Sequence, residues 1–306
     1  MSDQTYPVLP EIAAHAHVTA EQHRAMTEHA QTDPEGFWME QSKRISWITP
    51  PTKAKHGSFE GDVHVKWYED GVLNASAVCL DRHLAERPDQ VAIIWEGDNP
   101  SESRHITYRQ LHDEVCKMAN ILRTRNVKKG DRVTIYLPMI PEAAAAMLAC
   151  ARIGAVHSMV FGGFSAGALR FRVTDGNAKL LVTTDGQFRR GKAVPVKDNA
   201  DAAVEGVGSI EHVLVVKRTG ADVAWNDVDI WWEDALASAD PTHEAIGFEA
   251  EHPLFILYTS GTTGKPKGIF HTTGGYLTQV AYTNAVVHDV HPETDVYWCT
   301  ADVGWV

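Results

Sequence analysis

The sequence is poor in cysteine, and its metal-binding residue types show no ligand pattern. None of the four cysteines lies in a Cys-x-x-Cys pair; they are Cys79, Cys116, Cys150 and Cys299. Thiols this far apart favour a reduced, buried state over disulfides or structural zinc. Two histidine pairs, His15/His17 and His288/His291, have no cysteine or carboxylate in a recognised ligand pattern with them. We therefore predict no metal ligand in this chain.

Long apolar runs and an excess of basic residues are absent as well. No segment approaches the roughly eighteen apolar residues that predict a membrane-spanning helix. The first residues also lack a basic stretch followed by an apolar one. With 28 Lys and Arg against 40 Asp and Glu, the net charge is -12, which disfavours nucleic acid and anionic membranes as partners. These features predict a cytoplasmic protein whose anionic ligands are held by local positive groups.

Most of the 306 residues, 44% of which are hydrophobic, follow an α/β pattern. Residues 1–90 predict a mostly helical and irregular lead-in. From residue 91 onward, short apolar strands alternate with helical segments, which predicts βαβ units and a largely parallel sheet with helices on its faces. The predicted strands are Val91–Trp95, Arg132–Leu137, Ala155–Phe161, Leu180–Thr184 and His212–Val216. We assign residues 91–306 to one large domain that follows the lead-in.

Local signals indicate where three of the helices begin. Thr107, with Gln110 three residues later, forms a capping-box pattern. Pro141 suits the first position of a helix, and Ser165 can cap a helix that follows a glycine turn. The segment 200–208, rich in Gly, Asp and Ala, predicts a loop or linker.

The most specific motif is Tyr258–Gly268, Tyr-Thr-Ser-Gly-Thr-Thr-Gly-Lys-Pro-Lys-Gly, which directly follows the apolar run Leu254–Leu257. Its hydroxyls, glycines and lysines are groups that hold phosphate. It is not a Walker A loop, because its first two glycines are too close together and Lys265 is followed by proline instead of Ser or Thr. An ordinary surface turn is the alternative. The single chemistry of this long stretch favours a phosphate site.

This motif resembles the phosphate-binding signature of the adenylate-forming superfamily, which includes acyl-CoA synthetases, peptide-synthetase adenylation domains and luciferases. Other segments are similar to acetyl-CoA synthetases in particular: Asp33–Trp38, Ser46-Trp47, Trp67-Tyr68, Leu73-Asn74, Ile94–Asp98, Tyr136–Met139, His157–Ser165, His271–Tyr276 and Trp298–Val306. The resemblance runs from about residue 30 to the last residue. It implies an incomplete N-terminal domain of an adenylate-forming enzyme, preceded by the lead-in.

The resemblance implies a two-step ligase reaction. Acetate attacks the α-phosphate of ATP and releases pyrophosphate, and CoA then displaces AMP from the acyl-adenylate. The implied ligands are the small molecules acetate, ATP and CoA, with Mg²⁺ held by residues outside this chain. The residues implied to hold the phosphates are Thr259, Ser260, Gly261, Thr262, Thr263, Gly264, Lys265 and Lys267. The catalytic lysine is expected in a C-terminal domain, so no catalytic residue is assigned here.

The resemblance also places the nucleotide of CoA near a glycine turn and a later basic segment. The implied residues are Phe161, Gly162, Gly163, Arg189, Arg190, Gly191 and Lys192. Lys192 stands where the family pattern has arginine, so it keeps the charge but lacks the planar fork that binds phosphate through two bonds. Taken alone, the glycines are equally consistent with a tight connection, and the basic residues with a solvated turn.

Trp305 and Val306 correspond to residues that line the acyl pocket of the family. The chain ends on them with no polar tail, which is typical of a cut within a longer protein. Acetate–CoA ligase is the leading hypothesis; a propionyl- or other short-chain acyl-CoA synthetase and an inactive nucleotide-binding fragment are the alternatives. We expect the isolated chain to be inactive, and the sequence leaves its oligomeric state open.

Overall fold

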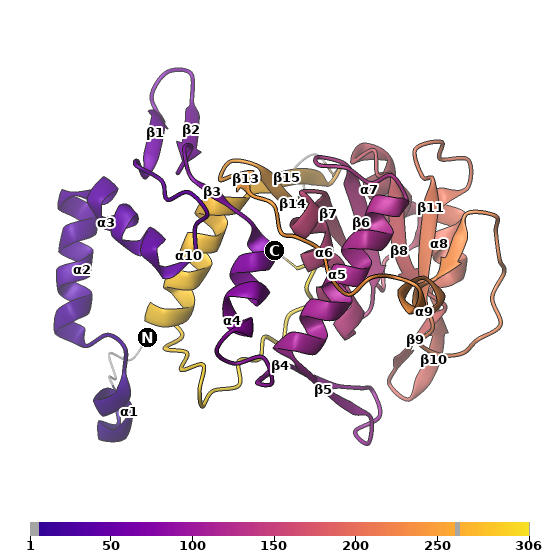
Figure 1. Ribbon diagram of the computed structural model, residues 1–306, viewed down its shortest axis with the longest axis horizontal. Coiled ribbons are helices and arrows are strands. Elements are labelled where there is room, and N and C mark those ends of the chain that lie inside the picture. Colours follow the sequence, from indigo (N-terminus) through magenta and orange to yellow (C-terminus); the bar gives the residue numbers. More distant parts are fainter. Residues whose placement is uncertain (1–5, 261–263, 306) are drawn as a thin grey trace.

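Helices and strands alternate through most of the molecule (Figure 1), and the computed structural model describes all residues except 1–5, 261–263 and 306. The helical segments are α1 (Pro10–His15), α2 (Ala20–Thr32), α3 (Pro34–Gln41), η1 (Ser42–Arg44), η2 (Ala77–Asp81), α4 (Arg82–Leu84), α5 (Tyr108–Thr124), α6 (Pro141–Ile153), α7 (Ala166–Asp175), α8 (Lys197–Val204), α9 (Trp232–Ala237) and α10 (Thr273–Val286). The strands are β1 (Lys55–Ser58), β2 (His64–Trp67), β3 (Val72–Leu73), β4 (Val91–Glu96), β5 (Ser103–Thr107), β6 (Arg132–Leu137), β7 (Val156–Phe161), β8 (Leu180–Thr184), β9 (Gly186–Arg189), β10 (Lys192–Pro195), β11 (His212–Val216), β12 (Asp229–Trp231), β13 (Phe248–Glu249), β14 (Pro253–Thr259) and β15 (Lys267–Thr272).

A seven-stranded sheet organises the fold, with the strand order β12-β11-β8-β6-β7-β14-β15. Neighbouring strands from β12 to β14 are parallel, and β15 joins the edge antiparallel to β14. The α/β fold with a largely parallel sheet is therefore confirmed. Its central strands are covered on both faces, which explains their nearly continuous apolar sequences.

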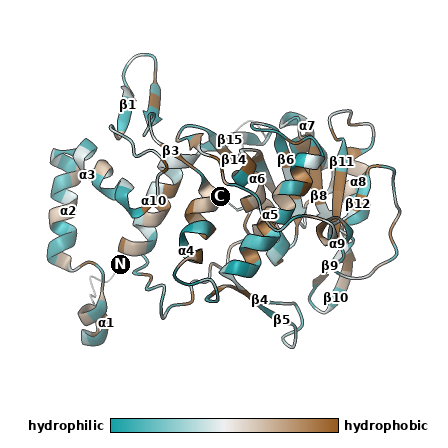
Figure 2. Cartoon of the chain, in the orientation of Figure 1, coloured by the Kyte–Doolittle hydropathy of each residue, from teal (hydrophilic) through white to brown (hydrophobic). Residues whose placement is uncertain are grey.

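Successive side chains of the central strands enter different hydrophobic cores. In β6, Val133 and Ile135 pack in a core with residues of α5, α6 and α9, whereas Tyr136 packs in a core with residues of α7 and α8. This alternation is the two-residue period of a strand. Figure 2 shows the hydrophobic colouring concentrated on the inner strands, including β8 and β11. The two helical layers therefore hold the sheet rigidly between them.

The lead-in packs against elements from the other end of the sequence. Figure 1 shows α3, near the start of the chain, beside α10, near its end. A third core joins Tyr68 and Leu73 of the lead-in to Leu254 and Phe255 of β14 and to Leu277 of α10. The lead-in also contains the antiparallel hairpin β1–β2, which the expectation of helical and irregular structure did not include.

Two sequence-based expectations for local structure were wrong. The strand predicted at Val91–Trp95 exists as β4, but it pairs antiparallel with β5 in a separate two-stranded sheet. Gly97 closes this hairpin by donating its N–H to the carbonyl of Glu102 at 2.7 Å. The predicted loop at 200–208 begins within α8, because Ala200 and Ala203 are fully buried in the core beside α7.

The three predicted helix starts are confirmed. Thr107 and Gln110 form the complete capping box of α5, and Pro141 is the first residue of α6. The Ser165 hydroxyl accepts the N–H of Ala168 and caps α7. This cap fixes the start of α7 beside the end of β7. None of the described helices combines the length and apolar character needed to cross a bilayer.

Candidate functional site

A cavity of about 530 Å³ opens where two parallel strands of the sheet end. Its lining residues, which define the loop cavity, are Met159, Phe161, Phe164, Arg172, Tyr258, Thr259, Ser260, Gly264, Pro266, Gly304 and Trp305. Strands β7 and β14 lie side by side and parallel, so their carboxyl ends meet at this edge. Ligands of open α/β sheets bind outside the carboxyl ends of the strands. The position of the cavity is thus that of a ligand site.

The predicted phosphate loop connects β14 to β15 at the mouth of this cavity. Thr259, Ser260 and Gly264 line the cavity, and Gly264 has a φ of 79°, which favours glycine. Gly261, Thr262 and Thr263 lie outside the described residues.

The two lysines of the motif are exposed and do not belong to the described lining of the loop cavity. Lys267 is the first residue of β15 and pairs with Thr259 across the strands. Lys265 is exposed and does not belong to the cavity lining. The motif is therefore the connection of a β-hairpin, a feature that the pattern of glycines and hydroxyls did not predict.

Helix α7 contacts the residue at which the phosphate motif begins. Tyr258 donates its hydroxyl to the Asp175 carboxylate at 2.8 Å, and burial raises the pKa of the Tyr258 phenol above its usual range. The guanidinium of Arg172 lies over the rings of Phe164 and Tyr258, at 4.6 and 5.3 Å from their centroids. The sequence pattern did not single out Arg172 or Asp175, because nothing local to α7 indicates that it packs on the end of β14.

A second cavity, of about 360 Å³, lies on the other side of Phe161. Its lining residues, which define the hairpin cavity, are Trp95, Glu96, Gly97, Asp98, Pro138, Met139, Ile140, Phe161, Gly162, Gln187, Phe188, Arg189, Arg218 and Asp302. Phe161 lines both cavities, so the two are neighbours. The hairpin cavity brings together the glycine turn after β7 and the basic hairpin β9–β10, which were predicted to share one ligand.

The predicted CoA residues are not equally close to the hairpin cavity. Phe161, Gly162 and Arg189 line it, and the Arg189 guanidinium lies 5.9 Å from the centroid of the Phe161 ring. A Cβ atom on Gly163 would stand 2.5 Å from the Phe161 ring and 3.3 Å from Nη1 of Arg189, so a side chain at this position would force the Phe161 ring to move. Lys192 is exposed and pairs with Arg189 across the hairpin, outside the lining.

Arg190 and Gly191 form the turn of the basic hairpin, and their backbone donors are already engaged. Both have positive φ angles, 53° and 74°. The N–H of Arg190 and the N–H of Gly191 donate to the two oxygens of Asp98, at 2.8 and 2.6 Å. Asp98 therefore fixes the turn from a distant hairpin, β4–β5. These N–H groups are used within the protein and are not available to a ligand in this conformation.

The hairpin cavity has a second arginine that the sequence did not reveal. Arg218 donates two hydrogen bonds of 2.8 Å to the carboxylate of Glu102. Its guanidinium also lies over the rings of Trp95 and Phe188, at 5.1 and 4.8 Å. Because Glu102 neutralises Arg218, Arg189 contributes the less compensated positive charge to this cavity.

Of the two residues predicted to line an acyl pocket, the structure describes only Trp305. Trp305 lines the loop cavity and remains 76% exposed, so its indole has room for further contacts. Val306 lies outside the described residues. Trp305 therefore lines the same cavity as Thr259 and Ser260.

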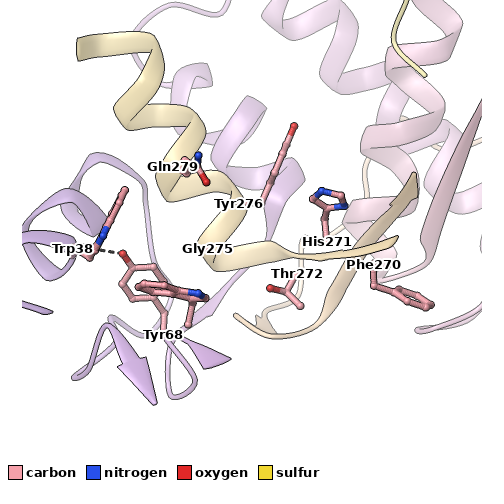
Figure 3. Close-up of a pocket in the computed structure, with 9 residues that line it drawn as sticks. Trp38, Tyr68, Phe270, His271, Thr272, Gly275, Tyr276 and Gln279 are labelled. Atoms are coloured by element: carbon pink, nitrogen blue, oxygen red, sulfur yellow. Dashed lines mark hydrogen bonds between the residues drawn. The ribbon is translucent and has the colours of Figure 1, made fainter. Parts of the chain in front are cut away.

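A third cavity, of about 380 Å³, lies between the lead-in and α10 (Figure 3). Its walls include Trp38, Tyr68, His271 and Tyr276. Tyr68 donates its hydroxyl to the carbonyl of Trp38 at 2.9 Å, and burial raises the pKa of Tyr68 to about 12. Hydrogen bonding within the lead-in thus shapes this aromatic cavity, which contains none of the predicted ligand residues.

One group of side chains has the composition of a metal site. His17, Asp289 and His291 bring their ligand atoms within 4.8 Å of one another. The sequence spacing did not indicate a carboxylate beside His17 or His291, because Asp289 reaches His17 only when the segment after α1 packs against the segment after α10. Their polar atoms already interact: His17 hydrogen-bonds the Val290 carbonyl through Nε2, and the His17 N–H donates to Asp289. These contacts give the group a structural role as it stands.

Two known families match this chain in sequence. The family described as AMP-binding enzyme matches residues 80–306, and the one described as acetyl-coenzyme A synthetase N-terminus matches residues 23–79.

Several proteins are similar to the whole chain. It is 55% identical over 309 residues to an acetyl-coenzyme A synthetase from Methylocella silvestris, covering all of this chain and 48% of that protein. It is also 55% identical over 305 residues to one from Vibrio cholerae, covering 98% of this chain and 47% of the relative. The chain thus spans about half the length of the curated relatives it matches. The solved structure of acetoacetyl-CoA synthetase from Streptomyces lividans is similar with a TM-score of 0.85 and 27% identity, over 96% of this chain and 45% of that one.

Proposed function

Because this chain belongs to the AMP-binding enzyme family and has the N-terminal region of acetyl-coenzyme A synthetases, we propose that it contributes to an acetate–CoA ligase. In the first step, a carboxylate oxygen of acetate bonds to the α-phosphorus of ATP, and the bond to pyrophosphate breaks. In the second step, the sulfur of CoA bonds to the acyl carbon, the bond to AMP breaks, and the thiol proton is released. The products are acetyl-CoA, AMP and pyrophosphate.

The observation that carries this proposal is the loop cavity. It combines hydroxyl groups of Thr259 and Ser260 with the glycine-rich connection after β14, at the carboxyl edge of a parallel sheet. Charge on transferring phosphoryl oxygens is stabilised by donors and positive groups that are placed before the reaction. In this proposal the residues from Thr259 to Lys265 hold the β- and γ-phosphates, and Lys267 supports them by charge.

The fit of a magnesium ion can be judged from the same lining. Mg²⁺ prefers oxygen ligands, commonly one or two carboxylates together with phosphate oxygens. No Asp or Glu belongs to the described lining of the loop cavity. The hydroxyls and backbone suit the phosphates, so a carboxylate ligand for Mg²⁺ has to come from outside these residues. When bound with ATP, the ion would neutralise charge on the phosphates.

For CoA, the proposal uses the hairpin cavity. Arg189 offers a guanidinium beside the glycine turn, and the aromatic ring of Phe161 separates this cavity from the loop cavity. A nucleotide in the hairpin cavity would thus lie next to the site of adenylate formation. Arg190, Gly191 and Lys192 support the hairpin in this proposal and touch the ligand less directly than Arg189.

Pyrophosphate–ATP exchange in a protein of the relatives' length that contains this chain tests the assignment. The double variant Gly261→Val, Gly264→Val should lose acetate-dependent exchange by roughly a hundredfold or more, because valine at position 264 disfavours its φ of 79° and two branched side chains would crowd the anion in this proposal. Gly130→Val is the matched control, since Gly130 has a φ of 82° and open space around it. Pyrophosphate–ATP exchange at the wild-type rate in the double variant would contradict the assignment of the motif to phosphate binding.

The same assay separates the alternatives. Faster exchange with propionate than with acetate would replace acetate by a longer acid. The 306-residue chain alone should release no AMP in the presence of acetate, ATP and CoA, because the catalytic lysine implied by the resemblance lies outside it. Acetate-dependent AMP release from the purified chain would contradict this part of the proposal.

A further inference from the structure

Arg172 is a buried arginine that faces the loop cavity and has no assigned role. It lies on α7, is 8% exposed and belongs to the cavity lining together with Thr259 and Ser260. Its guanidinium is held over the rings of Phe164 and Tyr258. Planar stacking of this kind orients the edge of a guanidinium.

In the part of the chain that the structure describes, the guanidinium of Arg172 makes one hydrogen bond. A guanidinium carries five N–H donors. Nη1 donates to the Ala168 carbonyl, one turn earlier in α7, at 2.8 Å. Among the described residues, no carboxylate oxygen lies within 4.0 Å of the Arg172 guanidinium, whereas Arg152 and Arg218 both have such a partner. Asp175, on the same helix, accepts the hydroxyl of Tyr258 instead.

A largely buried positive charge that has no carboxylate partner among the described residues is less well solvated than one in open water. Burial accordingly lowers the pKa of Arg172 from its usual value, although arginine keeps its charge at neutral pH. An anion in the cavity would restore the missing compensation. Bonds between a guanidinium and an oxyanion are among the strongest hydrogen bonds in proteins.

We propose that Arg172 is an oxyanion-binding residue of the loop cavity, which donates to a phosphoryl or carboxylate oxygen of a ligand bound beside Thr259 and Ser260. This inference rests on the proposed function and extends it by one residue. The two aromatic rings that hold the Arg172 guanidinium come from the two predicted binding segments: Phe164 from the glycine turn and Tyr258 from the phosphate motif. Arg172 thus stands between the two segments that the reaction has to bring together.

Calorimetric titration of the 306-residue chain with inorganic pyrophosphate, and separately with acetate, tests the inference. Arg172→Gln removes the charge, and Arg172→Lys keeps the charge without the planar fork. Arg170→Gln is the matched control, because Arg170 lies on the same helix and bonds backbone carbonyls of α8 and the residue after it. Lys265→Ala tests the phosphate motif independently. Far-ultraviolet circular dichroism and the melting temperature establish that each variant is folded.

We expect Arg172→Gln to weaken binding of one of the two anions by roughly tenfold to a hundredfold, and Arg172→Lys by at least about threefold. Arg170→Gln should stay within about twofold. The anion whose affinity falls identifies the group that Arg172 holds: pyrophosphate indicates a phosphoryl oxygen, and acetate a carboxylate. Should Arg172→Gln fail to fold, the Arg172→Lys variant decides the question by the same criterion.

Equal affinities of wild type and both folded Arg172 variants for both anions would overturn the inference. If Lys265→Ala still weakens pyrophosphate in that case, the phosphate motif stands and only the role of Arg172 is lost. If the wild-type chain binds neither anion, the role of Arg172 in this chain and the phosphate assignment of the motif both fail.

Discussion

Arg152 and Asp81 form a doubly hydrogen-bonded ion pair that joins the lead-in to helix α6. The Nη1–Oδ2 and Nη2–Oδ1 distances are 2.8 and 2.9 Å. Arg152 is 2% exposed, and its Nε also donates to the carbonyl of His243 at 2.9 Å. Although burial alone would raise it, hydrogen bonds from His112 and Arg152 hold the pKa of Asp81 well below its usual range. This pair anchors the lead-in to the parallel sheet.

Asp81→Asn should therefore destabilise the chain by about 3 kcal/mol, because it leaves the buried Arg152 without a counter-charge. Urea denaturation at neutral pH measures this loss. The control is Arg104→Met, which removes an ion pair with Glu142 whose arginine is 45% exposed, and it should change stability by less than about 1 kcal/mol. Equal losses in the two variants would show that burial does not decide the strength of the Asp81 pair.

Glu114, on α5, should make the protein less stable as the pH rises. Burial, followed by repulsion from Glu142, raises the pKa of Glu114 to about 7. A carboxyl whose pKa is raised by folding does not lower the free energy of unfolding below its unfolded pKa of about 4.3. As the pH rises from there through the folded pKa of about 7, the free energy of unfolding falls. Glu114→Gln should thus raise the free energy of unfolding by about 2 kcal/mol at pH 8.

The gain from Glu114→Gln should disappear at pH 4, where the wild-type side chain is protonated in the folded state. Urea denaturation at the two pH values gives both numbers. Asp113→Asn serves as the neighbouring control, since the Asp113 side chain is 46% exposed. A gain that is the same at pH 4 and pH 8 would mean that titration of Glu114 is not its cause.

Gly154 ends α6 in a conformation that also requires the absence of a side chain. Its φ is 73°, and a Cβ atom there would stand 2.6 Å from the ring of Phe248. Gly130 has a similar φ of 82° but nothing within 4 Å of such an atom. Both alanine variants carry a backbone strain of roughly 1–2 kcal/mol.

Gly154→Ala should cost at least about 1 kcal/mol more than Gly130→Ala, because the Phe248 ring has to move. Thermal and urea denaturation of the two variants provide the comparison. If their stabilities fall equally, Phe248 adjusts without strain and the close packing of β13 on the end of α6 is not required.

Arg189→Ala should weaken CoA binding to this chain by about tenfold, because the variant removes a guanidinium from the hairpin cavity. Arg190→Ala should have less than about a threefold effect, since its backbone N–H contact with Asp98 is preserved. Calorimetry with CoA, and with pantetheine as a ligand that lacks the nucleotide, measures both. A loss of pantetheine affinity as large as that of CoA would show that Arg189 does not act on the nucleotide.

Local sequence signals predicted much of the α/β unit correctly. Three helix starts were predictable from the sequence because they depend on contacts within four residues. They are the capping box of Thr107 and Gln110, the first-turn Pro141 and the Ser165 cap. Strands such as β6 and β8 were evident because both of their faces are buried. The wrong expectations concerned segments whose structure depends on distant partners, including β4 and α8.

The candidate site likewise combines features that local sequence predicts with features that depend on distant segments. The residue types of the phosphate motif and the glycine turn predict which ligands they bind, because glycine, hydroxyl and positive charge are local properties of the chain. Three features of the site could not be predicted from local sequence. They are the position of Arg172 in the loop cavity, the Arg218–Glu102 ion pair and the hydrogen bonds from the Arg190–Gly191 turn to Asp98. Each depends on elements that meet only when the sheet is complete.

By itself, the sequence determined the sheet-forming segments and their caps, and it predicts phosphate binding by Tyr258–Gly268, since hydrophobic period, capping and side-chain chemistry are encoded over a few residues. Only the tertiary structure decided that this motif is a hairpin connection beside Arg172, and that Phe161 separates two neighbouring cavities. The physical reason is that cavities and buried charges arise from packing between segments far apart in the chain, and their free energies depend on burial that no local pattern contains.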